Sequence, residues 1–319
     1  MNAPPAYPLE IARADLAPYR LGGSGVDFVH GFDSGRAGPH VMVNALTHGN
    51  ELCGMWAVKR LIDAGVRPRS GRLTLSFANV AAYERFGPDA LDTRFVDRDF
   101  NRLWRDDLID ADTRSVEAAR ARELRPVVAG VDRLLDLHST WHALEPFFVL
   151  ARLPRVRACA DALALPPRQL LLPDVWHEGF HLIDYGAFRA PDAGAIGLIA
   201  ECGQHFAQRA VDQAWRTAVR FLEFTGTLDA EQAQSLCPGV APESPIERFE
   251  IAQPVIAATD ALRLTVSYAG FSRHAEGEVV GFDGERPVTA PFDGAVLLAP
   301  RPDPKAGQQA FSWGRELPA

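Results

Sequence analysis

The sequence predicts an α/β protein with a mixed, largely parallel sheet flanked by helices, followed by a smaller all-β segment. In the first part of the chain, short and nearly continuous apolar runs alternate with amphipathic stretches. Such runs are typical of strands buried on both faces of a parallel sheet. After about residue 230 the pattern changes to short apolar runs separated by Gly, Pro and Asp, which favours antiparallel strands joined by tight turns.

The first part contains five predicted strands and two long predicted helices. We expect the strands at residues 40–46, 73–78, 131–137, 146–151 and 195–200. A helix is expected over 51–64, where apolar residues recur every three or four positions and Gly65 follows as a stop signal. A longer helix is expected over 205–224, before Gly226. Strands that alternate with helices predict helices on both faces of the sheet.

The change in pattern predicts two domains. We expect an α/β domain over residues 1–235, in which residues 1–35 form a Pro- and Gly-rich peripheral lead-in. A linker is expected at Pro238, Pro242 and Pro245. A small β domain is expected over residues 246–319, with strands at 246–256, 262–271, 278–282 and 295–299.

The composition indicates a globular protein and argues against two classes of partner. Hydrophobic residues make up 47% of the 319 residues, and charged residues make up 23%, so a sizeable core is expected. The net charge of -8 argues against nucleic acid or an anionic membrane as a partner, because both require a basic surface. Nearly all the positive charge is arginine, since lysine occurs only at Lys59 and Lys305. Arginines grip carboxylates through two parallel hydrogen bonds, so a small anionic substrate stays open.

Two further features predict a cytoplasmic location. The N-terminal residues lack a basic start followed by an apolar run, and the longest apolar runs are too short to span a bilayer. The four cysteines are scattered without a C-x-x-C pair, which fits a reducing compartment. The sequence leaves a homo-oligomer open.

The residues that carry chemistry follow predicted strands. His48 and Glu51 follow the first strand, His138 follows the third, and Glu201 follows the fifth. Ligand sites of α/β sheets lie beyond the carboxyl ends of strands, so these side chains are expected to meet. Two histidines and one carboxylate are a common ligand set for catalytic zinc. Asp136 is either an orienting partner for a ligand histidine or simply a residue on the same strand face.

A polar segment between these positions, residues 94–102, is predicted to be a loop. Arg94, Asn101 and Arg102 suit binding of a carboxylate and polarisation of a carbonyl. The alternative is an exposed charged loop in which Arg98 pairs with Asp97 or Asp99.

Several other polar residues have both a functional and a structural interpretation. Cys53 and Cys202 lie next to a predicted ligand and to Glu201, but buried cysteines usually act as small hydrophobic residues. The remaining candidates for lining the pocket, or for surface and core roles, are Ser139, Thr140, His142, His177, His181 and His205.

Four motifs in order resemble the succinylglutamate desuccinylase/aspartoacylase family, a branch of the zinc carboxypeptidase superfamily. They are His48-Gly-Asn-Glu51, Arg94 followed after six residues by Asn101-Arg102, Asp136-Leu-His138, and Glu201-x-Gly203. The resemblance implies a zinc-carboxypeptidase-like sheet and one zinc ion per chain.

The resemblance also implies a role for each matching residue. His48, Glu51 and His138 match the zinc ligands, Glu201 matches the general acid/base, and Arg94 matches the residue that polarises the scissile carbonyl. Asn101 and Arg102 match the pair that binds the substrate carboxylate, and Tyr185 and Arg189 resemble a further substrate-binding pair. The gap from that pair to Glu201 is slightly longer here than in aspartoacylases, and residues 246–319 do not follow either named enzyme motif by motif.

The implied activity is hydrolysis of the amide bond of a small, carboxylate-bearing N-acyl amino acid. Two alternatives stay open. One is a carboxypeptidase- or ester-cleaving relative with the same zinc site, and the other is a non-catalytic protein of this fold that binds a small acid. A binding protein has no need for Glu201, which favours an enzyme.

Overall fold

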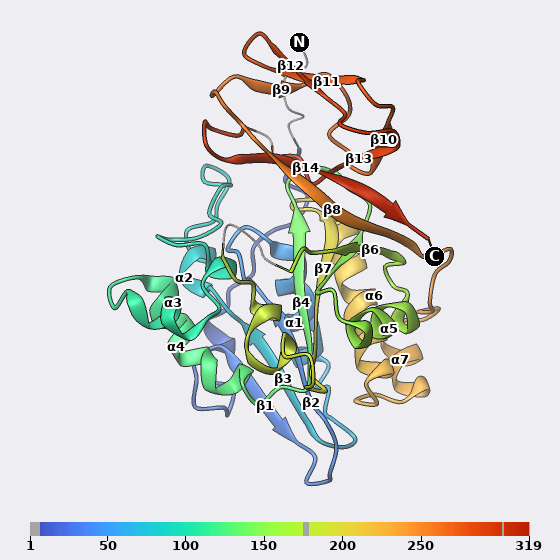
Figure 1. Ribbon diagram of the computed structural model, residues 1–319. Coiled ribbons are helices and arrows are strands. Elements are labelled where there is room, and N and C mark those ends of the chain that lie inside the picture. The colour runs from blue at the N-terminus through green and yellow to red at the C-terminus, as the bar shows by residue number, and fades with distance from the viewer. Residues whose placement is uncertain (1–6, 175–178, 302, 319) are drawn as a thin grey trace.

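The computed structural model describes residues 7–174, 179–301 and 303–318 (Figure 1). Within these residues the strands form an 11-stranded sheet in the order β1-β3-β2-β4-β7-β5-β6-β8-β14-β13-β10, and a 3-stranded sheet in the order β12-β11-β9. Four neighbouring strands, β3, β2, β4 and β7, are parallel to one another. The next three, β5, β6 and β8, form a second parallel run that is antiparallel to β7. The predicted fold class, a mixed and largely parallel sheet flanked by helices with a smaller β region, is therefore confirmed.

The first part of the chain supplies seven strands of the large sheet. They are β1 (Val29–Asp33), β2 (His40–Ala45), β3 (Arg72–Phe77), β4 (Arg133–Thr140), β5 (Phe147–Leu150), β6 (Arg168–Leu171) and β7 (Ile196–Gln204). Its helices are α1 (Leu52–Asp63), α2 (Val80–Tyr83), α3 (Asp106–Ala111), α4 (Val116–Val128), α5 (Pro154–Leu163), α6 (Gln208–Phe224) and α7 (Ala230–Leu236). Short 3-10 turns lie at η1 (Ala17–Tyr19), η2 (Phe100–Arg102), η3 (Leu182–Asp184) and η4 (Gly186–Phe188).

Alternation along the central strands divides the core into two layers. Val41, Val43 and Leu135 belong to the layer that contains α1 and α6, whereas Met42 and Leu134 belong to the layer that contains α4. Successive residues of a strand point to opposite faces of the sheet. The side chains of Asp136, His138 and Glu201 therefore lie on the α4 face, two or four residues along from apolar residues of that layer.

The C-terminal strands gather at one end of the molecule, toward which β4 points (Figure 1). They are β8 (Glu247–Ile256), β9 (Leu262–Leu264), β10 (Ser272–His274), β11 (Val279–Asp283), β12 (Arg286–Thr289), β13 (Ala295–Leu298) and β14 (Gln309–Leu317). A separate apolar cluster is built there around Phe311 and Trp313. Strand β8 pairs with β6 in parallel, so the large sheet continues from the first part of the chain into this segment. The division into two domains stays a prediction.

Two predicted strand ends are wrong. We expected strands to end just before His138 and just before Glu201, but β4 runs to Thr140 and β7 runs to Gln204. The reason is continued pairing, because His138 faces Glu201 and Thr140 faces Gln204 in the parallel ladder, with a register shift between the two pairs. The helix predicted from residue 205 accordingly begins at Gln208.

The segment expected to be a peripheral lead-in contributes to the core. Its strand β1 forms the edge of the large sheet beside β3. Ile11 and Leu16 pack in the α1–α6 layer, and Val29 is fully buried in the other. Through the described part of the chain, no helix combines the length and apolarity that crossing a membrane would need.

Candidate active site and metal centre

The site begins where β2 leaves the sheet. Leu46 adopts a positive φ of 57°, and the chain then turns through Thr47-His48-Gly49 into α1. Gly49 is required by close approach, because a Cβ there would lie 2.4 Å from the backbone carbon of Ala82. Its N–H donates to the carbonyl of Arg94, 3.1 Å away. The turn therefore fixes His48 beside the start of α1 and beside the loop that carries Arg94.

Three predicted ligands converge. His48, Glu51 and His138 are each 2% exposed, and one potential ligand atom from each lies within 4.8 Å of the others. The Nδ1 atoms of His48 and His138 each lie 2.8 Å from a different oxygen of Glu51. Two imidazoles and a carboxylate from separate parts of the chain thus face one small volume.

The second nitrogen of each histidine is held by another carboxylate. His138 Nε2 lies 2.8 Å from Asp136 Oδ2, and His48 Nε2 lies 3.1 Å from Asp99 Oδ1. Asp136 is fully buried and also accepts hydrogen bonds from Asn44 and Thr47. Histidines that ligate metal usually donate their other ring N–H to such a group, which fixes the tautomer and the ring orientation. The donor set and its supports therefore fit zinc, which takes nitrogen and oxygen ligands.

Asp99 is a functional candidate that the sequence analysis did not identify. We considered it as an ion-pair partner of Arg98, but its Oδ2 accepts from Arg94 Nε at 3.0 Å while Oδ1 faces His48. Burial disfavours the Asp99 charge, yet Arg94 and His48 outweigh this and hold its pKa well below the usual range. The position of Asp99 within residues 94–102 could have suggested a functional role, but sequence spacing alone does not show which charged side chain it contacts.

Glu201 faces the same volume from β7. Its Oε2 is buried and has no hydrogen-bond partner among the described residues. Burial, together with repulsion from Glu51, raises its pKa to about 8, although His138 and Arg94 pull in the opposite direction. A carboxyl that has one buried, unbonded oxygen and holds a proton near neutral pH suits a proton-transfer role.

Arg94 completes this group. Its Nη1 lies 3.5 Å from Glu51 Oε1, and its side chain is 34% exposed, so the guanidinium reaches solvent beside the cluster. Burial opposes its charge, but Asp99 and Glu51 raise its pKa above the ordinary value. A permanently charged donor beside two imidazoles and a carboxylate suits stabilisation of a developing oxyanion.

The other predicted substrate-binding residues make internal contacts. Asn101 is buried, and its Oδ1 accepts from the N–H of Leu182 at 2.8 Å. Arg102 donates to the Asn101 carbonyl at 2.9 Å, and its charge also acts on Asp99. The link between Arg102 and the cluster thus runs through Asp99, which contacts His48.

The Tyr185 hydroxyl donates to Asp106 Oδ1 at 2.9 Å, and Arg189 pairs with Asp184 at 2.5 Å. The structure gives neither of these side chains a contact with the His48–Glu51–His138 cluster.

The remaining candidate histidines and hydroxyls bond to other parts of the protein, and one of these pairs, Ser139 and His205, adjoins the site. His205 Nδ1 lies 2.8 Å from the hydroxyl of Ser139, whose N–H faces Glu51 Oε2 at 3.3 Å. The Thr140 hydroxyl donates to the His142 carbonyl. The other partners are Tyr7 for His142 Nδ1 and Asp184 for His181 Nδ1, and His177 lies outside the described residues.

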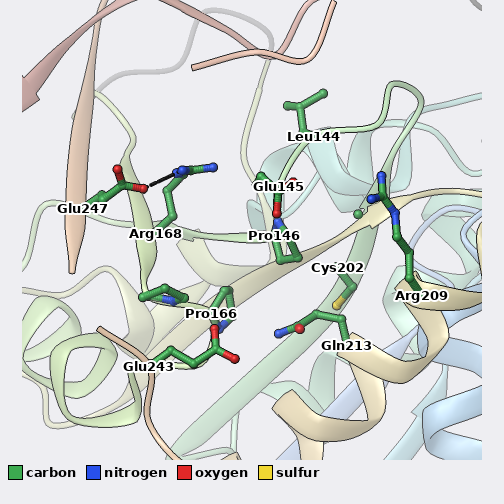
Figure 2. Close-up of a pocket in the computed structure, with 12 residues that line it drawn as sticks. Leu144, Glu145, Pro146, Pro166, Arg168, Cys202, Arg209, Gln213, Glu243 and Glu247 are labelled. Atoms are coloured by element: carbon green, nitrogen blue, oxygen red, sulfur yellow. Dashed lines mark hydrogen bonds and ion pairs between the residues drawn. The ribbon is translucent and has the colours of Figure 1, made fainter. Parts of the chain in front are cut away.

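Cys53 and Cys202 lie on the other face of the sheet. Both belong to the α1–α6 layer and are buried, as small hydrophobic residues usually are. Figure 2 shows that Cys202, with Arg209 and Gln213 of α6, lines a cavity of about 300 Å³. Because Cys202 and Glu201 are neighbours on β7, this cavity and the ligand cluster face opposite sides of the strand.

Comparison with known proteins agrees with this geometry. A family model described as the succinylglutamate desuccinylase/aspartoacylase catalytic domain matches residues 37–225. A probable aspartoacylase of Parasynechococcus marenigrum is 36% identical over 138 residues, which are 40% of this chain and 44% of that protein. A succinylglutamate desuccinylase of Burkholderia cenocepacia is 26% identical over 290 residues, 85% of this chain and 79% of that protein.

Two further similarities bear on substrate class and fold. An N-acyl-aromatic-L-amino acid amidohydrolase of Xenopus tropicalis is 31% identical over 119 residues, 34% of this chain and 36% of that protein. The match with this relative, like that with the Parasynechococcus protein, thus spans less than half of the relative's length. The crystal structure of succinylglutamate desuccinylase from Vibrio cholerae superposes with a TM-score of 0.68 at 20% identity, covering 91% of this chain and 85% of that one. This last similarity concerns the fold alone.

The contact between Asp99 and His48 gives a first prediction. Replacing Asp99 by Asn should weaken zinc binding by about 10–100-fold, because His48 loses the carboxylate that orients its ring. Competition with a chromogenic chelator measures this. Asp92→Asn, which changes an exposed carboxylate of the same segment, is the control. Equal zinc affinity in the Asp99 variant and in the control would contradict the orienting role.

Proposed function

Because the chain belongs to the succinylglutamate desuccinylase/aspartoacylase family, whose catalytic-domain model covers more than half of it, we propose that it is a zinc-dependent deacylase. It hydrolyses the amide bond of a carboxylate-bearing N-acyl amino acid, releasing a carboxylic acid and an amino acid. The observation that carries the proposal is the convergence of His48, Glu51 and His138 near Glu201, whose Oε2 has no hydrogen-bond partner in the described part of the chain. The names of the matched relatives, which include an aspartoacylase and an amino acid amidohydrolase, support this substrate class.

His48, Glu51 and His138 hold the metal in this proposal. A zinc ion bound there supplies a Lewis acid that polarises the acyl carbonyl and lowers the pKa of water to about 7. Asp136 and Asp99 keep the imidazoles in the orientation that ligation requires.

Glu201 moves the protons. In its ionised form it takes a proton from the attacking water, and the same carboxyl then delivers that proton to the departing amine. Its raised pKa suits both directions of transfer, because a carboxyl that titrates near neutral pH both gains and loses a proton readily.

Arg94 and the 101–102 pair act on the substrate. Arg94 donates to the carbonyl oxygen as negative charge develops there. Arg102, with Asn101 beside it, binds the substrate carboxylate and so orients the amide toward the cluster. Tyr185 and Arg189 stay the less direct candidates for the same carboxylate, since Arg189 must exchange its bond to Asp184 for the substrate.

The proposal is tested by a substrate panel on the zinc-loaded chain. N-acetylaspartate, N-succinylglutamate and N-acetyl aromatic amino acids are compared with dipeptides and carboxylic esters, and release of free amine, or of acid from the esters, is measured. Turnover of at least one N-acyl amino acid is the expected result. Turnover of peptides or esters alone would select the carboxypeptidase- or esterase-like alternative. A zinc-loaded chain inert toward the whole panel would favour the non-catalytic alternative.

Substitution of Arg94 gives a second prediction. Arg94→Met should lower kcat by about 10²–10³-fold with little change in zinc affinity, because the guanidinium stabilises charge that develops only in the transition state. Steady-state kinetics on a hydrolysed substrate measures this. Arg98→Met, four positions along the same loop, is the matched control and should keep kcat within about 2-fold, as is usual for a substitution away from the chemistry.

A further inference from the structure

The loop that carries Arg94 and Asp99 is held by a carboxylate from a different element. Between these residues the loop has no regular structure, so its backbone N–H groups need partners from elsewhere. Glu117 is that partner for three consecutive residues. The N–H groups of Val96, Asp97 and Arg98 all donate to its carboxylate, at 2.6, 3.1 and 3.2 Å. Consecutive backbone N–H groups that surround one anion are a known way of fixing both partners.

The position of Glu117 suits it to hold this loop. It is the second residue of α4, its side chain is fully buried, and a carboxylate is favoured at a helix N-terminus. Its fourth hydrogen bond comes from Asn79 Nδ2 at 2.9 Å. Both oxygens therefore accept two bonds each, which satisfies a group whose burial would otherwise be costly.

The loop also binds the start of α4 in return. Asp97 accepts from the Ser115 hydroxyl at 2.6 Å and from the N–H of Val116 at 2.9 Å. A carboxylate of the helix thus caps the loop, and a carboxylate of the loop caps the helix. This reciprocal pair fixes the loop against α4 from two sides.

The contacts of Glu117 with the loop and of Asp97 with α4 determine the geometry of the proposed active site. Arg94 and Asp99 flank the three bound N–H groups and bond to each other at 3.0 Å. Asp99 continues to His48 at 3.1 Å, and the Arg94 carbonyl accepts from Gly49. A shift of the loop would therefore move the donor for the oxyanion and the support of a metal ligand together.

We propose that Glu117 is a positioning residue for hydrolysis, which sets the places of Arg94 and Asp99 through its bonds to the loop backbone. This rests on the proposed function for the roles of those two residues. It extends the active site by one layer, to a residue that touches neither the substrate nor the metal.

The test compares Glu117→Gln with Glu123→Gln, an exposed glutamate on the same helix. A glutamine turns one accepting oxygen into an N–H donor that faces other donors, so the loop loses its cap. In the metal-free chain, hydrogen exchange of the amides of residues 96–98 should quicken by about 10-fold or more, since these amides lose their partner. In the zinc-loaded enzyme, kcat/KM should fall and zinc affinity weaken by about 10-fold or more, as for other supports of a metal site. Glu123→Gln should change neither.

A double-mutant cycle with Asp99→Asn separates positioning from a general loss of stability. If Glu117 acts through Asp99, its substitution should cost much less kcat/KM when Asp99 is already replaced, because the two residues are coupled. Additive losses would overturn the proposal, and so would unchanged exchange of the loop or unchanged kcat/KM. Should the glutamine variant fail to fold, Glu117→Asp and Asp97→Asn take its place under the same criteria. If the wild-type chain hydrolyses nothing, the proposed function fails, whereas exchange and zinc affinity still decide whether Glu117 holds the loop.

Discussion

Glu201→Gln is expected to lower kcat by about 10²–10⁴-fold while zinc still binds, because general acid–base catalysis is worth that much and glutamine neither accepts nor delivers the proton. The substitution keeps the shape of the side chain and leaves His48, Glu51 and His138 untouched. Rapid-quench or steady-state measurement of amine release gives kcat, and chelator competition gives the zinc affinity.

The matched control for this prediction is Glu145→Gln, an exposed glutamate on the loop between β4 and β5. It should keep wild-type rates, because surface substitutions away from a site usually change little. If the Glu201 variant retained full activity, another group would have to be the base, and the role assigned to Glu201 would be wrong.

The raised pKa of Glu201 also predicts a pH dependence of stability in the metal-free chain, which the Glu201→Gln variant tests. Burial raises the folded-state pKa of Glu201 to about 8, above the ordinary value of 4.5. Between these values the folded chain holds a proton that the unfolded chain releases, so stability falls as pH rises through this window. Glu201→Gln removes the penalty. Its melting temperature should therefore exceed that of wild type at pH 7 and match it below pH 4.5, and a difference that grows toward low pH would contradict this account.

His138→Ala is expected to abolish tight zinc binding and also to destabilise the metal-free fold by about 3–5 kcal/mol, the usual cost of breaking a buried ion pair. Burial opposes protonation of His138, but Asp136 and Glu51 raise its pKa well above the ordinary value. Without the imidazole, the side-chain donors left to Asp136 within the described residues are the neutral groups of Asn44 and Thr47. Urea unfolding with a chelator present measures the loss, and zinc analysis by mass spectrometry measures the metal.

A histidine outside the cluster supplies the comparison. His40, at the start of β2, is also buried and bonds through both ring nitrogens, to the Gly130 carbonyl and to Thr74. His40→Ala should lower stability but leave the zinc content unchanged. Retention of full zinc content in the His138 variant would remove this residue from the ligand set and with it the proposed metal centre.

The sequence by itself determined the fold class and named the three residues of the candidate metal site, His48, Glu51 and His138. In the run at residues 40–46 every position except His40 and Asn44 is apolar, a pattern typical of a strand buried on both faces. The candidate site residues could be named because His48, His138 and Glu201 lie close to the carboxyl ends of parallel strands, and such ends share one edge of the sheet.

The tertiary structure alone decided how far the strands run and which charges meet. His138 and Glu201 lie inside β4 and β7 because the two strands continue to pair beyond them, which no local pattern encodes. Spacing likewise could not tell whether Asp99 faces Arg98 beside it or His48, which is 51 positions away. Local sequence fixes which face of an element a side chain occupies, whereas a contact between distant segments depends on how the whole sheet brings their backbones together.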